Sequence, residues 1–302
     1  MPLNPRLKGY SYALLATVAG STVYIFSKAA FNQVSLPQFG VYWFSMAIAW
    51  NLLYTLRSEK HRHLPAFSRK SFKALLLIGM IDLIATGAFY AAIQTSVNPA
   101  IPSFLRNMEY IFVTLMGVFL LRERFTVKEL TGVVLTFSGA MVISYDKNAT
   151  FSSYLSGTSG LMLLSTVFYG VRTILVKSNI NVLSPTTLAI NRAIFLLIFS
   201  VIMLLIFRQS LVIPGKALLN IAIGSFFGPF LTSIGQYSAL KYIEASRSAI
   251  IQSTTALFVL VGAYLIFGRF PLGYQLAGGA LTIAGPMWLL LAKRISPGRN
   301  HK

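Results

Sequence analysis

Apolar residues dominate ten long stretches of this chain, and polar residues gather in the connections between them. Each stretch is long enough to cross the hydrocarbon core of a membrane, which requires about 20 residues in a helix. The pattern therefore predicts an all-α integral membrane protein with ten transmembrane helices. The predicted spans cover residues 8–31, 37–56, 72–93, 99–121, 126–144, 157–176, 185–207, 216–240, 248–267 and 271–292.

The second half of the chain repeats the first. The segment GVVLTFSGAM at 132–141 returns as GGALTIAGPM at 278–287, and GVFLLRERF at 117–125 returns as GAYLIFGRF at 262–270. Near the start of each half, Lys28 aligns with Lys177. Because each half holds an odd number of spans, the second half must enter the membrane from the opposite side. The sequence predicts two inverted five-helix repeats, residues 1–146 and residues 147–302 with a short cytoplasmic tail, an arrangement typical of secondary transporters.

Composition and charge place the chain in a membrane. Of its 302 residues, 55% are hydrophobic and only 11% are charged, which argues against a soluble domain. The net charge of +19 could indicate nucleic-acid binding, but most basic residues lie at the termini and in every second connection. The alternate connections hold only Lys147, Arg208, Lys216 and Arg269. This bias predicts that both termini are cytoplasmic in a bacterial-type inner membrane, with basic side chains contacting anionic lipid rather than nucleic acid.

The residue types that most enzymes require are scarce. The chain has no cysteine, and its histidines, His61, His63 and His301, lie in a loop and in the tail. There is no phosphate-binding glycine loop and no carboxylate-rich metal cluster. We therefore expect neither an enzyme nor a bound cofactor or metal, and no ATP-driven pump within this chain.

The repeated motifs resemble a known family. The run LLRERFT at 120–126, followed by a span that carries Gly132 and Gly139, and the spacing from Pro185 to Arg192 are similar to motifs of the EamA-type members of the drug/metabolite transporter superfamily. As a whole the chain looks most like the YddG-like amino-acid exporters. The resemblance implies a cavity lined by the first, third, fourth, sixth, eighth and ninth helices. Gly268 stands where the first half has Glu123, and Phe44 stands opposite Arg192, so the two halves have diverged.

A charge at membrane depth costs about 2.5–3.5 kcal/mol, so ionisable residues inside the spans are candidates for function. Six are considered: Lys28, Asp82, Arg106, Glu109, Arg172 and Arg192. Asp82 falls near the expected midplane, where it either contacts substrate or forms an ion pair with Arg172 or Arg192. Arg106 and Glu109 share a helix face, so they either face a substrate carboxylate and ammonium group or neutralise one another. Of the other three, Arg172 is a further cavity candidate, Lys28 is expected to reach the interface, and Arg192 is expected to act in packing or gating.

Aromatic and amide side chains form a second set of cavity candidates. A site for apolar or aromatic solutes needs a mostly apolar pocket with a few fixed polar groups. Trp43, near a span end, is expected instead in the interfacial aromatic belt. The set comprises Tyr24, Tyr90, Asn107, Tyr110, Phe168, Tyr169, Gln236, Tyr237 and Gln252.

Proline and glycine mark expected breaks and close contacts. Pro99 and Pro102 open the fourth span, and Pro229 and Pro286, each after a glycine, are expected to interrupt the eighth and tenth spans. Gly224 and Gly228, four residues apart, predict close helix packing.

These observations predict a secondary transporter that exports small organic metabolites, with apolar or aromatic amino acids as the expected substrates, by alternating access. A carrier of another metabolite or drug is the alternative, and an integral-membrane enzyme acting on lipid is a more distant one. Any proton coupling is expected to run through Asp82 or Glu109, because the other five acids lie in connections or at helix ends. The pattern leaves open whether the protein is a monomer or a homodimer.

Overall fold

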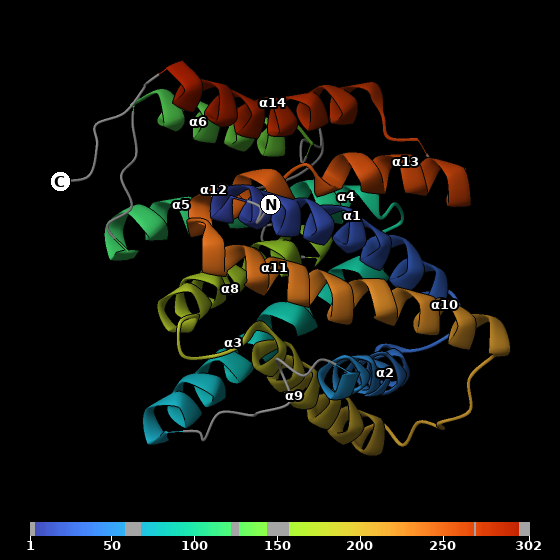
Figure 1. Ribbon diagram of the computed structural model, residues 1–302. Coiled ribbons are helices and arrows are strands. Elements are labelled where there is room, and N and C mark those ends of the chain that lie inside the picture. The colour runs from blue at the N-terminus through green and yellow to red at the C-terminus, as the bar shows by residue number, and fades with distance from the viewer. Residues whose placement is uncertain (1–3, 58–67, 122–126, 144–156, 269, 296–302) are drawn as a thin grey trace.

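The computed structural model describes residues 4–57, 68–121, 127–143, 157–268 and 270–295, and every regular element in these ranges is a helix (Figure 1). The prediction of an all-α protein is therefore confirmed. Five of the described helical stretches are long and apolar enough to cross a membrane. The helices are α1 (Pro5–Phe31), α2 (Leu36–Arg57), α3 (Arg69–Thr95), α4 (Ala100–Leu105), α5 (Asn107–Leu121), α6 (Val127–Ile143), α8 (Gly157–Asn179), α9 (Pro185–Ile206), α10 (Gly215–Ser225), the π-helical turn η2 (Phe226–Thr232), α11 (Ser233–Tyr242), α12 (Ala245–Gln252), α13 (Thr255–Phe267) and α14 (Gly273–Ile295).

Local sequence signals set several helix starts. Pro5 and Pro185 occupy the first positions of α1 and α9, where a missing N–H costs no helical hydrogen bond. The hydroxyl of Ser68 accepts a hydrogen bond from the backbone N–H of Ser71 at the start of α3. Ser184 caps α9 in the same way. Such caps satisfy backbone donors that the first helical turn leaves without a partner.

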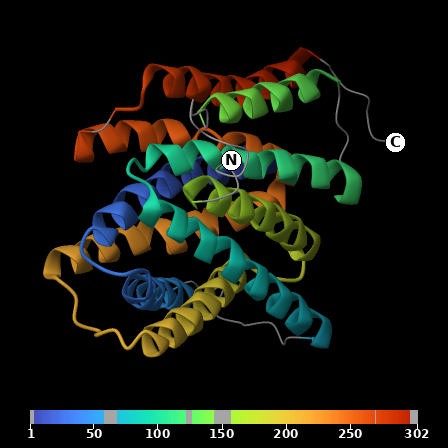
Figure 2. The ribbon, with the colours of Figure 1, turned by 180° about the vertical axis from the view of Figure 1, so that it is seen from behind.

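Helices from residues 1–146 pack against helices from residues 147–302 throughout the molecule. Helix α1 lies along α10, η2 and α11, and α3 lies along α8. Figures 1 and 2 show α6 beside α14 at one end and α2 beside α9 at the other. Helix α5 contacts both α8 and α12, while α1 contacts α12 and α13. The buried core is thus built mainly between the two parts of the chain.

Two lysines at aligned positions make the same kind of contact. At the end of α1, the Nζ of Lys28 donates hydrogen bonds to the carbonyls of Ile93 and Gln94, 3.3 and 3.1 Å away in the last turn of α3. In the second part, the Nζ of Lys177 in α8 donates to the carbonyls of Leu240 and Ile243, both at 2.7 Å, where α11 ends. Each lysine therefore ties one helix to the carboxyl end of another, where carbonyl groups lack helical partners.

One of the two expected proline breaks is present and the other is not, and the fourth span has a break that was not predicted. The fourth predicted span is divided into α4 and α5 at Arg106, after Pro102. The eighth contains η2, in which Pro229 supplies no N–H and the hydroxyl of Thr232 donates to the carbonyl of Phe227 at 2.8 Å. Helix α14, in contrast, continues through Pro286, so the expected interruption of the tenth span was wrong. The side chain of Pro286 itself lies outside the described residues.

Trp43 was also predicted wrongly. It is fully buried instead of interfacial, and its ring packs on Phe39 and Tyr90 with centroid distances of 4.6 and 6.0 Å. Gly224 makes room for it, since a Cβ at that glycine would come within 2.5 Å of the indole. The predicted close packing at Gly224 and Gly228 is present, and the aromatic partner that requires it lies on α2.

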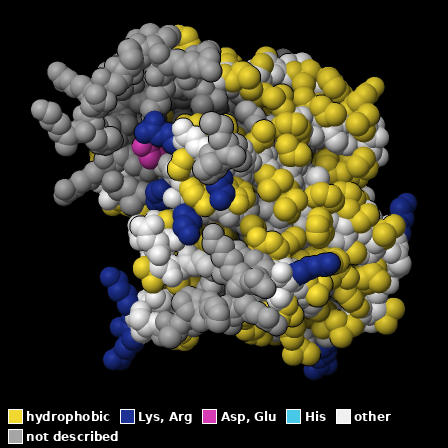
Figure 3. Space-filling view, in the orientation of Figure 1, with side chains coloured by type: hydrophobic (Ala, Val, Ile, Leu, Met, Phe, Trp, Pro, Cys, Tyr) yellow, Lys and Arg dark blue, Asp and Glu magenta, His cyan; other side chains and the backbone are white. Residues whose placement is uncertain are grey.

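Apolar side chains cover much of the exterior. Figure 3 shows hydrophobic groups spread over a broad part of the visible face, with scattered lysines and arginines both within it and at its edges. Among the large exposed residues are Phe119, Leu265 and Leu205. An apolar surface of this extent suits a protein whose surroundings are lipid chains instead of water.

Candidate functional site

A pocket lies between the two parts of the chain. It encloses about 610 Å³ of empty space, counting its open mouth. Its lining from the first part comes from α1, α3, α4 and Arg106, and from the second part it comes from α9, η2, α11, α12 and α13. The lining residues are Ala16, Gly20, Val23, Tyr24, Phe89, Tyr90, Ser103, Arg106, Arg192, Gly228, Pro229, Thr232, Gln236, Gln252 and Thr255.

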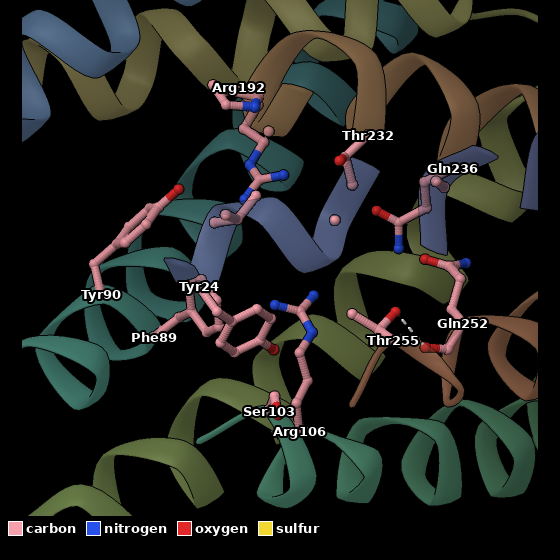
Figure 4. Close-up of a pocket in the computed structure, with 15 residues that line it drawn as sticks. Tyr24, Phe89, Tyr90, Ser103, Arg106, Arg192, Thr232, Gln236, Gln252 and Thr255 are labelled. Atoms are coloured by element: carbon pink, nitrogen blue, oxygen red, sulfur yellow. Dashed lines mark hydrogen bonds between the residues drawn. The ribbon is translucent and has the colours of Figure 1, made fainter. Parts of the chain in front are cut away.

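Two arginines reach the pocket from opposite parts of the chain. Figure 4 shows the side chains of Arg106 and Arg192 extending toward one another, with the ring of Tyr24 to one side. Arg106 stands at the joint between α4 and α5, where its N–H donates to the carbonyl of Pro102 at 2.9 Å. Arg192 projects from the middle of α9. The break after Pro102 thus positions the guanidinium of Arg106 in the pocket, and the unbroken helix α9 positions that of Arg192.

The rest of the wall is aromatic on one side and carries amides on the other. Phe89 and Tyr90 lie with Tyr24 on the aromatic side of the close-up, and Gln236 and Gln252 lie across from them (Figure 4). The amide of Gln252 donates to the hydroxyl of Ser248 at 2.9 Å, which fixes its orientation. A mostly apolar wall with a few fixed polar groups is the usual form of a small-molecule site.

A chain of ion pairs extends behind the pocket. Arg106 Nη2 lies 3.0 Å from Glu109 Oε2, and Arg172 Nη2 lies 3.9 Å from Glu109 Oε1. Arg172 Nη1 is 3.4 Å from Asp82 Oδ1, which in turn is 3.6 Å from Arg192 Nε. Each carboxylate is thereby shared between two guanidinium groups. Asp82, Glu109 and Arg172 are nearly or completely buried, so this network is held in place by packing as well as by charge.

Tyr169 lies at the centre of these arginines. The guanidinium carbons of Arg106, Arg172 and Arg192 lie 4.3, 4.6 and 5.8 Å from the centre of its ring. The Nη2 of Arg192 donates to the Tyr169 hydroxyl and to Thr86 Oγ1, both at 3.1 Å, and these two oxygens are 2.8 Å apart. Cation–π attraction in a buried site is worth about 2 kcal/mol. The fully buried Tyr169 therefore positions both pocket arginines without lining the pocket.

The sequence-based candidates fall into distinct groups. Those in the pocket wall are Tyr24, Tyr90, Arg106, Gln236 and Gln252, with Gly228 and Pro229. Six candidates are buried and do not line the pocket: Asp82, Asn107, Glu109, Tyr169, Arg172 and Tyr237. Phe168 is half-buried, packs on a core cluster and does not line the pocket. Pro99 and Pro102 belong to the start of α4, and Gly224 packs on Trp43. The side chain of Tyr110 lies outside the described residues.

The structure places the ionisable residues of the predicted site in ion pairs with one another. Asp82 forms ion pairs with both Arg172 and Arg192, and Arg106 pairs with Glu109. Neither carboxylate lines the pocket, so the suggested contact of Glu109 with a substrate ammonium group finds no support in the geometry. Arg192, to which the sequence assigned packing or gating, also lines the pocket.

Sequence reasoning missed several residues of the wall, among them Phe89, Ser103, Thr232 and Thr255. A signal existed for the two threonines. Thr232 precedes Gln236 by four positions and Thr255 follows Gln252 by three, spacings that in a continuous helix put each threonine on the same face as a predicted residue. The small residues of α1 that line the pocket carried no comparable signal.

The described residues hold no group of three or more His, Cys, Asp or Glu side chains that could bind a metal ion. The two buried carboxylates are engaged by arginines instead. The pocket wall offers a ligand charge, hydrogen bonds and aromatic contact.

Comparison with known proteins gives a consistent result. The sequence model of the EamA-like transporter family matches residues 7–145 and 158–291. The chain is 24% identical over 231 residues to an uncharacterized transporter of Archaeoglobus fulgidus, covering 74% of this chain and 79% of that protein. A protein crystal structure is similar with a TM-score of 0.73 and 15% identity, over 97% of this chain and 99% of the other, which shows a shared fold.

Proposed function

We propose, from the premise that this chain belongs to the EamA-like transporter family, that it carries apolar or aromatic amino acids out of the cell by alternating access. Membership of the family already makes it a membrane transporter of a small-molecule substrate. The proposal adds the substrate class, the direction and the mechanism. The observation that carries it is one pocket lined by both parts of the chain, with aromatic rings, two amides and two arginines in its wall.

The packing of the helices supports an inverted repeat. We take α1 to α6 as one copy of five spans and α8 to α14 as the other. In the second copy, α10, η2 and α11 together form the third span. The contact of α1 with α11 then joins the first span of one copy to the third span of the other. Helix α3 against α8 is the reciprocal contact, and α2–α9 and α6–α14 join equivalent spans. Reciprocal contacts are what a two-fold axis between the halves requires. Exchange of the two halves' conformations would then open the shared pocket to alternate sides.

The wall of the pocket supports an amino-acid substrate. Tyr24, Phe89 and Tyr90 offer aromatic contact to an apolar side chain, and the arginines offer charge to a carboxylate. A nucleotide sugar or other phosphorylated metabolite could use the same arginines, so the family alone leaves that alternative open.

Flux into proteoliposomes tests the substrate class. We expect purified protein to accelerate uptake of labelled phenylalanine and leucine, with glutamate and lysine transported far more slowly. Gln236→Leu should change the order of preference among amino acids, because its amide lies in the pocket wall. Movement of nucleotide sugars with no amino acid transported would contradict the proposal.

Accessibility of introduced cysteines tests the topology. With both termini in the cytoplasm, a cysteine near Lys60 should be protected from impermeant reagents in intact cells, and one near Lys147 should react. The chain contains no cysteine of its own, so no background labelling has to be removed. The reverse labelling pattern would overturn the predicted orientation.

A further inference from the structure

In the cluster of ionisable side chains at the pocket, the positive charges outnumber the negative charges. Three of them are arginines, Arg106, Arg172 and Arg192, and two are carboxylates, Asp82 and Glu109. Since both carboxylates are already shared between arginines, the described cluster keeps one net positive charge. A charge inside a membrane protein is costly unless an opposite charge accompanies it.

Among the three arginines of the described cluster, the two that are partly exposed also line the pocket. Arg172, in the middle of the network, is 1% exposed and does not line the pocket. Arg106 and Arg192, at its two ends, are 18% and 12% exposed and both do. Their side chains extend into the same space from opposite sides (Figure 4). An anion in that space would lie between two guanidinium groups, which bind carboxylates through paired N–H donors.

No carboxylate stands in the described wall of the pocket to attract a cation. The polar groups across from the arginines are the neutral amides of Gln236 and Gln252 and the hydroxyls of Thr232 and Thr255. An ammonium group there would gain hydrogen bonds but no ion pair, and it would be repelled by the excess positive charge.

We infer that Arg106 and Arg192 form a subsite for one carboxylate, and that the transporter selects monoanionic carboxylates with an apolar or aromatic body, for which an amino group is not required. This inference rests on the proposed transport function. It changes the expected set of substrates in two ways. Amines and amides of the same shape are excluded, whereas carboxylic acids without an amino group are accepted.

Binding to the purified full-length protein tests the inference separately from transport. The probes are phenylalanine, 3-phenylpropanoate and 2-phenylethylamine, which share a ring and differ in charged groups. We expect the first two to raise the melting temperature and the amine to leave it unchanged. Equal stabilisation by the amine, or none by 3-phenylpropanoate, would overturn the inference. If phenylalanine and 3-phenylpropanoate both bind but neither is transported, the proposed function fails while the subsite stands.

Charge-changing variants give a second test with opposite signs. Arg192→Gln removes the excess charge and one guanidinium, and should weaken binding of 3-phenylpropanoate about 10- to 100-fold, the range expected for a lost hydrogen bond to a charged group. Glu109→Gln increases the excess charge and should strengthen the same binding. If the network were merely structural, both changes would damage binding alike. Weakening by Glu109→Gln to the same degree would therefore contradict a carboxylate subsite.

Discussion

Replacing Lys177 by methionine tests how one helix of this fold is held to another. The variant keeps most of the apolar stem and removes two hydrogen bonds from Nζ to the carbonyls of Leu240 and Ile243, both 2.7 Å long. A hydrogen bond to a charged group contributes about 1.5–3 kcal/mol, and part of the loss is recovered when the carbonyls find other partners. We therefore expect a loss of about 3 kcal/mol in the free energy of unfolding. The bonds of Lys28, at 3.3 and 3.1 Å, are longer, so Lys28→Met should cost about half as much.

Thermal unfolding of the purified protein in detergent measures the effect. At about 2–4 °C per kcal/mol, Lys177→Met should lower the melting temperature by about 6–12 °C. Lys241→Met is the matched control, because Lys241 lies in the same last turn of α11 with its side chain exposed. A shift below about 1 °C for Lys177→Met, or an equal shift for Lys241→Met, would refute the argument that these hydrogen bonds hold α8 to α11.

Three further predictions follow from packing and charge. Gly224→Ala should cost about 1–3 kcal/mol of stability, because the added Cβ would come within 2.5 Å of the buried indole of Trp43. Gly87→Ala is the control and should be neutral, because nothing lies within 4 Å of its added Cβ. Equal melting temperatures of the two variants would contradict this prediction. Arg172→Met should cost about 3–5 kcal/mol, since it leaves two buried carboxylates with one partner fewer, and an unchanged melting temperature would show that Arg172 is dispensable. If flux responds to a pH gradient, Asp82→Asn or Glu109→Gln should abolish the response, and an unaltered response in both would exclude these acids as the proton site.

The sequence predicted the helices well because each is a local property of the chain. Long apolar runs, capping serines and prolines near helix starts are visible without any tertiary information. The pairing of Arg106 with Glu109 was within reach for the same reason, since three residues along a helix bring side chains to one face. The break between α4 and α5 was not predicted, because Pro99 and Pro102 were expected only to open the fourth span.

What the sequence could not decide depends on contacts between distant segments. Trp43 near a span end is compatible with the interface, and only the approach of Gly224 on α10 makes it a core residue. The pairing of Asp82 with Arg172 requires α3 and α8 to lie side by side, which no spacing along the chain reveals. Prediction of the pocket wall is limited in the same way. Phe89 and Ser103 have no distinguishing sequence signal, and they become wall residues only because the second part of the chain packs near them.

The π-helical turn η2 has a consequence for how related transporters could differ in substrate. A π turn holds one residue more than an α turn, and each residue of a helix accounts for about 100° of rotation. A homologue with one residue fewer at this point would form a regular helix and rotate all that follows by about that angle. Gln236 would then leave the pocket wall and a neighbouring side chain would take its place. A single deletion here could thus exchange one wall of the site at once, a change that comparing residues position by position would not reveal.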